Sequence, residues 1–267
     1  MKKVNVMNQV KKHLVFTLGI FALVACKKVD AAKGTSEDHI INETGFTAIE
    51  FATGGDLTFT ESPSTSIIVN TTDKVFKAMD IYVENSILYL KTRKGYNIKN
   101  SEEINGTISA PNVNSLACSG SGNVDANIDI STEYTAFNLA VSGSGSMRTT
   151  VINATNQNIS VSGSGSLTVD ELIAENVTAI ISGSGGINVR AGETSYTDLV
   201  VCGSGSYKGF NLTAAIVDIN ISGSGKTEVT ANEELDALIS GSRNVYYKGN
   251  PIINVSSSGS VNLINAN

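Results

Sequence analysis

The stretch ISGSGGINVR, residues 181–190, contains the motif SGSG, and this motif or a close variant occurs eight times in the 267-residue chain. Successive copies begin 23, 20, 20, 20, 20, 18 and 18 residues apart. Self-similarity at about 20 residues is typical of a stacked repeat protein, in which each unit buries its apolar side against its neighbours. The second residue of the motif is always glycine, at Gly120, Gly143, Gly163, Gly183, Gly203, Gly223, Gly241 and Gly259.

Between two motifs, apolar residues occur in three short bursts of alternation. In the coil that begins at Ser162, the apolar or small residues are Leu167, Val169, Leu172, Ala174, Val177, Ala179 and Ile181. A period of two predicts strands, and a slip of one residue between bursts predicts a corner. Because equivalent strands repeat in register, they must run parallel. The sequence therefore predicts an all-β fold, a parallel β-helix with coils of about 20 residues, and parallel crossovers of this kind are nearly always right-handed.

Three roles for SGSG can be compared. A phosphate-binding loop would occur once and lead into a helix, whereas this motif recurs and leads into strand residues. A flexible linker would not recur at a fixed period between alternating apolar segments. The serines also lack a nearby base that would activate a nucleophile. We interpret SGSG as a structural turn, where glycine permits a positive φ or a close backbone approach.

The N-terminus has the features of an export signal. Four lysines precede an apolar run over residues 14–25, which is too short to span a bilayer and ends in LVAC at residues 23–26. That tetrapeptide resembles the bacterial lipobox. The resemblance implies a lipoprotein signal peptide over residues 1–25 and lipid attachment at Cys26; the alternative is an ordinary signal peptide with a chance cysteine. Membrane contact would then be through the lipid anchor only.

The stretch 26–44 is polar and has no sustained period, so we expect a lipidated tether between the lipid and the fold. It contains His39, the only histidine after residue 25, so neither a histidine base nor a histidine metal cluster is expected. Without residues 1–25 the chain has 15 basic and 25 acidic side chains, a net charge of −10. This charge argues against nucleic acid as a partner, because phosphate binding needs a basic footprint. No cofactor is predicted.

Cys118 and Cys202 are the remaining cysteines. In an exported protein they could form a disulfide. However, they lie four coils apart, roughly 19 Å at about 4.8 Å per strand, and a disulfide allows about 7 Å between α carbons. We therefore expect two free thiols that behave as small, mostly buried groups.

Residues 45–118 are rich in β patterns but irregular. Apolar residues near 46–51, 57–59, 67–69, 81–83, 87–90 and 104–108 predict short strands separated by Gly, Asn, Ser and Pro turns. A solenoid needs its ends covered, because an end coil has an unpaired edge. We predict an N-terminal portion over residues 45–118, made of degenerate coils or a cap, followed by regular coils over residues 119–267.

The lipobox, the stretches GFTAIEFATGGDLTF (residues 45–59) and IYVENSILYLKT (residues 81–92), and the SGSG series together resemble the auto-transporter adhesin, head GIN domain family. The resemblance covers residues 45–267. It implies a right-handed β-helix, similar to pectin-lyase-type solenoids but without their catalytic residues, on exported proteins of Gram-negative bacteria. The family's proposed role is adhesion, and the resemblance supplies no binding residues.

Two outward columns of residues are candidate binding features. Four residues before each turn, Asp198, Asp218 and Asp236 should stack at intervals of about 4.8 Å. They form either a cation site, for example for Ca²⁺, or a solvated polar ladder, and the ladder is the expected reading. Two residues before each turn, an apolar column contains Ile180, Val200 and Leu238. We expect the N-terminal portion to cover this column, the alternative being a partner surface.

Two tyrosines complete the candidate residues. The alternation of side chains along a strand places Tyr207 inward, as a core residue. It places Tyr246 outward, where it is a candidate for stacking on a sugar.

These features favour a non-catalytic, lipid-anchored envelope protein, an adhesin-like module that binds a glycan or protein partner. Its predicted place is the outer membrane, at the cell surface or the periplasmic face. The alternatives are a structural envelope β-helix without a specific ligand, and a polysaccharide-active β-helix enzyme. The enzyme is disfavoured because the aspartate column has no basic residue at equivalent places in the neighbouring coils. The sequence leaves a homo-oligomer open.

Overall fold

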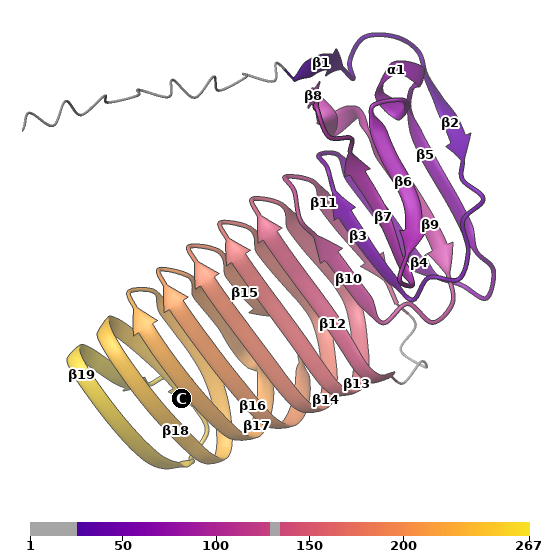
Figure 1. The fold of residues 1–267 in the computed structure, drawn as a ribbon. Coiled ribbons are helices and arrows are strands. Elements are labelled where there is room, and N and C mark those ends of the chain that lie inside the picture. The colour runs from indigo at the N-terminus through magenta and orange to yellow at the C-terminus, as the bar shows by residue number, and fades with distance from the viewer. Residues whose placement is uncertain (1–25, 129–133) are drawn as a thin grey trace, which may run out of the picture.

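The computed structural model describes residues 26–128 and 134–267 (Figure 1). The predicted signal peptide lies outside the described residues. Strands dominate, interrupted by the short α-helix α1 (Asp73–Phe76) and a 3₁₀ helix (Ser101–Glu103). No helix among the described residues is long and apolar enough to cross a membrane. The predicted all-β class is confirmed.

A stack of parallel coils forms most of the molecule. Residues one repeat apart are paired in register, as in the series Ile159, Ala179, Leu199 and Ile219. This pairing confirms the parallel β-helix and its coils of about 20 residues. Its strands are β12 (Tyr134–Gly143), β13 (Ser146–Gly163), β14 (Ser166–Gly183), β15 (Gly186–Val189), β16 (Gly192–Gly203), β17 (Ser206–Gly223), β18 (Lys226–Lys248) and β19 (Ile252–Asn265).

The SGSG turns bring the backbones of successive coils close together. In the turn at residues 182–185, Gly183 has a φ of +115°. The N–H groups of Ser184 and Gly185 both donate to the carbonyl oxygen of Gly163 in the previous coil, at 2.8 and 2.9 Å. A β carbon on Gly183 would lie 2.5 Å from that same oxygen. The position therefore needs glycine for both its backbone angle and its contact distance.

The core follows the alternation in the sequence. In the coil that begins at Ser162, six of the seven predicted inward residues are fully buried, and Ala174 is half-buried. Buried side chains stack from coil to coil, as in the column Val161, Ile181, Val201, Ile221 and Ile239. Fully burying each side chain of this size contributes about 1.5–3 kcal/mol.

The N-terminal portion adds two further levels to the stack. One level contains β3 (Ala48–Ala52) and β4 (Asp56–Glu61), and the outer level contains β7 (Ile87–Thr92) and β9 (Asn105–Ala110). β3 and β4 pair in parallel with this outer level on one side and, on the other, with β10 (Ser115–Cys118) and β11 (Asn123–Asn127). The chain thus goes out to the end of the stack and returns beneath β3 and β4.

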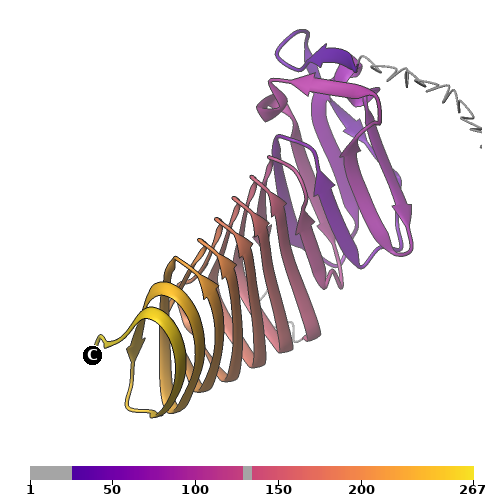
Figure 2. The same ribbon diagram turned by 60° about the vertical axis from the view of Figure 1, so that its left-hand side comes forward.

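Antiparallel strands close the outer end of the stack. β5 (Ser66–Thr72) pairs with β9, and β6 (Met79–Glu84) pairs with β7. β2 (Ser36–Ile40) pairs with β5. Side chains of β5, such as Ile67 and Val69, are buried. Figures 1 and 2 show these strands at the end of the molecule opposite the C-terminus.

The prediction that residues 26–44 form a tether is wrong. β1 (Lys27–Asp30) pairs in parallel with β8 (Tyr96–Lys99), and β2 is the strand already described. Ala31, which directly follows β1, is 3% exposed. Both strands lie at sheet edges, where backbone hydrogen bonds are formed without a buried apolar face. For that reason the polar sequence carries no visible strand period.

Candidate functional site

The outward side of the strand segments before the SGSG turns forms one continuous surface, the acidic face, over residues 176–182, 196–202, 216–222, 234–240 and 252–258. On it, Asp198 of β16, Asp218 of β17 and Asp236 of β18 are paired in register. Asn254 of β19 continues the column. The predicted stacking of these three aspartates is therefore confirmed, and the cation site stays a prediction.

Hydrogen bonds from neighbouring side chains partly compensate the negative charge of this column. The phenol of Tyr196 donates a hydrogen bond to Asp218. This bond raises the pKa of Tyr196 to about 12, and desolvation and the charges of Asp198, Asp218 and Asp236 add to the shift. The side-chain amide of Asn254 donates to Asp236 at 2.8 Å. The column is thus a mixed ladder of carboxylates and hydrogen-bond donors.

An open groove of about 460 Å³ runs along the acidic face. Leu238 lies at this groove and is 55% exposed, Ile180 is 43% exposed, and Val200 between them in register is half-buried. The prediction that the N-terminal portion covers this apolar column is wrong, because that portion stacks on the end of the coils and leaves their sides open (Figure 2). The groove is lined by Asp198, Asp218, Ile219, Asn220, Asp236, Ala237, Leu238, Asn254, Val255 and Ser256.

Tyr207 and Tyr246 lie on the sides of their strands that the alternation of side chains predicts. Tyr207 is 1% exposed and belongs to the core. Tyr246 is half-buried, and the ammonium group of Lys226 lies 4.8 Å from its ring centroid. Because Lys226 occupies one side of that ring, Tyr246 is a smaller platform for a sugar than the sequence implies.

The cysteines differ in exposure. Cys118 is buried, its thiol donates to the carbonyl oxygen of Gly122 at 3.2 Å, and burial raises its pKa. Cys202 is exposed, so the prediction that both thiols are buried is wrong for Cys202. It occupies the first place of a turn, in register with Ser182 and Ser222, where side chains point outward. Cys26, the predicted lipid attachment residue, is exposed.

His39 lies on β2 and not in a tether. Its ring stacks on the ring of Phe76 at the end of α1, with centroids 4.0 Å apart and planes 5° apart. Its Nε2 lies 3.2 Å from the carbonyl oxygen of Thr71. These contacts hold β2 against the segment that follows β5. The sequence shows no signal for them, because they join residues more than 30 positions apart.

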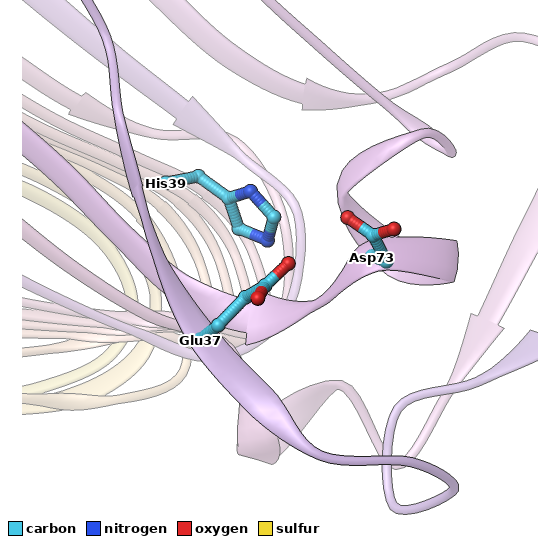
Figure 3. Close-up of side chains that lie close together, drawn as sticks. All are labelled: Glu37, His39 and Asp73. Carbon is cyan, nitrogen blue, oxygen red and sulfur yellow. The ribbon is translucent and has the colours of Figure 1, made fainter.

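His39 also belongs to a cluster with Glu37 and Asp73, shown in Figure 3. One ligand atom from each residue lies within 4.8 Å of the others. One imidazole and two carboxylates could hold a divalent metal. However, Lys77 already donates to Asp73 at 3.2 Å, and this hydrogen bond lowers the pKa of the Asp73 carboxyl. We therefore interpret the cluster as a polar contact between β2 and α1.

The stacked coils and the open acidic face define the chain as a β-solenoid protein. The model of the family described as "putative auto-transporter adhesin, head GIN domain" matches residues 45–251. The chain belongs to this family. None of the curated proteins matches the sequence.

Several solved structures have the same fold. A protein of Parabacteroides merdae described as a putative adhesin is 21% identical, with a TM-score of 0.81 over 90% of this chain and 100% of its own. One of Parabacteroides distasonis described as a putative lipid binding protein is 24% identical, with a TM-score of 0.75 over 90% of this chain and 99% of its own. A putative adhesin of Bacteroides fragilis is 24% identical, with a TM-score of 0.59 over 89% and 99%. At these identities the likeness concerns the fold alone.

Proposed function

We propose that this protein is a non-catalytic, adhesin-like binding module of the cell envelope, which presents the acidic face to a glycan or protein partner. The description of its family as adhesins supports an envelope role. The observation that carries the proposal is the groove on the acidic face. It combines carboxylates, amides and the exposed side chain of Leu238 on a regular, rigid scaffold.

The chemistry of the groove suits a large, hydroxylated or amide-bearing partner. Asp198 and Asp218 offer carboxylate oxygens that accept hydrogen bonds, and Asn220 and Asn254 offer amides that both donate and accept. Leu238 offers an apolar contact between these polar groups. The groove is open, so it fits a repeating chain that lies along the coils better than an enclosed small molecule.

A role as a polysaccharide-active enzyme has little support. None of the described residues that line the groove is basic, and Asp218 already accepts a hydrogen bond from the phenol of Tyr196. Acid–base cleavage needs carboxylates whose environments separate their roles. All three stacked aspartates are half-buried, so burial does not separate their roles. We therefore propose binding without catalysis.

Anchoring completes the proposal. Cys26 is exposed and lies next to β1, so an acyl group on its thiol would not disturb the core. We propose that acylation at Cys26 holds the protein at the outer membrane. Protease treatment of intact cells, compared with cells whose outer membrane has been opened, tests which face of the membrane carries the domain.

A glycan array tests the binding role. The expected result is binding to an envelope or host glycan that falls at least tenfold in the double variant Asp218→Asn and Leu238→Ser. The matched control is Glu193→Gln, an exposed acidic residue outside the groove. Absence of any glycan ligand for the folded protein would exclude the glycan partner and leave a protein partner or the alternative, a structural envelope β-helix.

A further inference from the structure

A basic pocket lies at the capped end of the molecule, opposite the C-terminal coils. It has a volume of about 420 Å³, and its lining residues come from β1, β8 and the region around α1. Figure 1 shows these three elements near one another at that end. Five of its lining residues are lysines and one is an aspartate, in a chain whose net charge is otherwise strongly negative. The lysines are Lys27, Lys28, Lys33, Lys74 and Lys77.

The lysines come from two separate segments, residues 27–33 and 74–77, and their charge is only partly neutralised. Lys33 lies 3.7 Å from Asp30, which also lines the pocket, and Lys77 lies 3.2 Å from Asp73 beside it. Even with Asp30, Asp73 and the neighbouring Glu37 counted, five positive charges face three negative ones. All five lysines are exposed, so their ammonium groups are accessible to a partner. The aromatic ring of Tyr96 also lines the pocket.

Almost no unstructured chain separates this pocket from Cys26. The backbone N–H of Lys27 donates to the carbonyl oxygen of Gly95 at 2.7 Å, and Lys27 is already paired with Tyr96. Cys26 is therefore one residue away from folded structure, a reach of about 3.5 Å. An acyl group on Cys26 would hold the capped end directly against the bilayer surface.

We propose that the basic pocket docks on the phosphate groups of anionic membrane lipids. The inference rests on the proposed acylation of Cys26, which brings the pocket to the membrane. A polybasic patch beside a lipid anchor acts as a further membrane signal. Each lysine near an anionic surface strengthens the partition onto it by about fivefold.

Docking at this end also orients the binding surface. Asp218 lies on β17, seven strand levels from β7 at the capped end, which corresponds to about 34 Å along the stack. The basic pocket would face the membrane, and the acidic face would be kept away from its negative charge. The solenoid would then stand out from the bilayer and present its groove to a partner.

Vesicle flotation tests the proposal without the acyl chain. The chain from residue 26, with Cys26→Ser, contains every buried core residue that the structure describes. It is mixed with phosphatidylcholine vesicles with or without 30% phosphatidylglycerol. We expect binding to the anionic vesicles at low salt and its loss at 0.5 M NaCl. The double variant Lys74→Gln and Lys77→Gln should bind about 25-fold more weakly.

The matched control is the double variant Lys208→Gln and Lys248→Gln, which removes the same charge from the coils. Equal loss in both double variants would overturn the proposal, because net charge alone would then explain binding. Absence of binding to anionic vesicles at low salt would also overturn it. So would saturation of the pocket by millimolar inorganic phosphate without vesicle binding, which would indicate a small-anion site. Mass spectrometry of Cys26 tests acylation separately.

A fluorescence measurement tests which end of the protein faces the membrane. The chain has no tryptophan, so Tyr96→Trp places a single fluorophore in the pocket. On anionic vesicles that contain brominated lipids, its emission should be quenched. The control Tyr246→Trp lies on β18 in the coils and should not be quenched. The opposite pattern would overturn docking through the capped end.

Discussion

The phenol of Tyr196 on β16 donates a hydrogen bond to the carboxylate of Asp218 on the neighbouring strand β17. The bond is diagonal, because Tyr196 itself is paired with Ile216 and Asp218 with Asp198. It therefore links two outward columns of the acidic face. This link places a neutral donor beside a stack of three carboxylates, which reduces their mutual repulsion and holds Asp218 in one position.

The first prediction concerns this bond and pH. The pKa of Tyr196 is raised to about 12 in the fold from an ordinary value near 10, so its contribution to stability is fully present below pH 10 and is lost as pH rises through 12. Tyr196→Phe should lower the free energy of unfolding by about 1 kcal/mol at pH 8. Denaturant titrations of both proteins should converge between pH 10 and 12. A difference that stays constant to pH 12 would contradict the assigned bond.

The second prediction concerns the turn glycines. Gly183→Ala should lower the free energy of unfolding by about 3 kcal/mol, because it combines a positive φ with a contact of 2.5 Å to the backbone of Gly163. Gly95→Ala is the control. Gly95 also has a positive φ, +88°, but a β carbon there meets nothing within 4 Å, so about 1 kcal/mol is expected. Equal losses, measured by denaturant unfolding, would show that the close contact contributes nothing.

The regular coils could be predicted from sequence because the same alternation of apolar residues and nearly the same spacing of turns recur from coil to coil. Alternation at Leu167 and Val169, or at Val177, Ala179 and Ile181, reports which side of a strand is buried, and the constant spacing fixes the register. The same register places the aspartates on one outward column. Most strands of residues 45–118 could also be located, namely β3 to β7 and β9, whereas β8 and β10 were not predicted. Their order in the stack could not, because β3 and β4 lie between levels that are separated from them in sequence.

The remaining differences come from contacts that leave no local pattern. The edge strands β1 and β2 are held by backbone hydrogen bonds and by the stacking of His39 on Phe76. The exposure of Leu238 depends on where the N-terminal portion packs, which is a long-range property. The basic pocket gathers Lys27 and Lys74 from segments almost 50 residues apart. No spacing rule along the chain connects such residues.

The third prediction concerns His39. His39→Ala removes the stacking on Phe76 and the contact with the Thr71 carbonyl, and should cost about 1–2 kcal/mol of local stability. Hydrogen exchange should become faster at the amides of β2 and stay unchanged in β17. Ile40→Ala is the matched control on the same strand, because Ile40 is 73% exposed and its loss should have little effect. Equal acceleration by both variants would contradict the anchoring role of His39.

The last prediction separates the two cysteines of the coils. In the chain with Cys26→Ser, a thiol reagent at pH 8 should modify Cys202 in the native state and modify Cys118 at least about 100-fold more slowly, because Cys118 must wait for local opening. Burial also raises the pKa of Cys118, so less thiolate is present at any pH below that value. Mass spectrometry of the labelled protein measures both rates, with denatured protein as the reference in which they should be similar.

Substitution with serine provides the matching stability test. Cys202→Ser restores the residue found at the first place of the other turns, so its effect should stay below about 0.5 kcal/mol. Cys118→Ser buries a hydroxyl where a thiol packs, and should cost about 1–3 kcal/mol. Native labelling of both thiols at the same rate, or equal losses of stability, would contradict the burial of Cys118. A protected Cys118 and a reactive Cys202 would establish that the first place of the turn at residues 202–205 faces solvent, as its register with Ser182 and Ser222 requires.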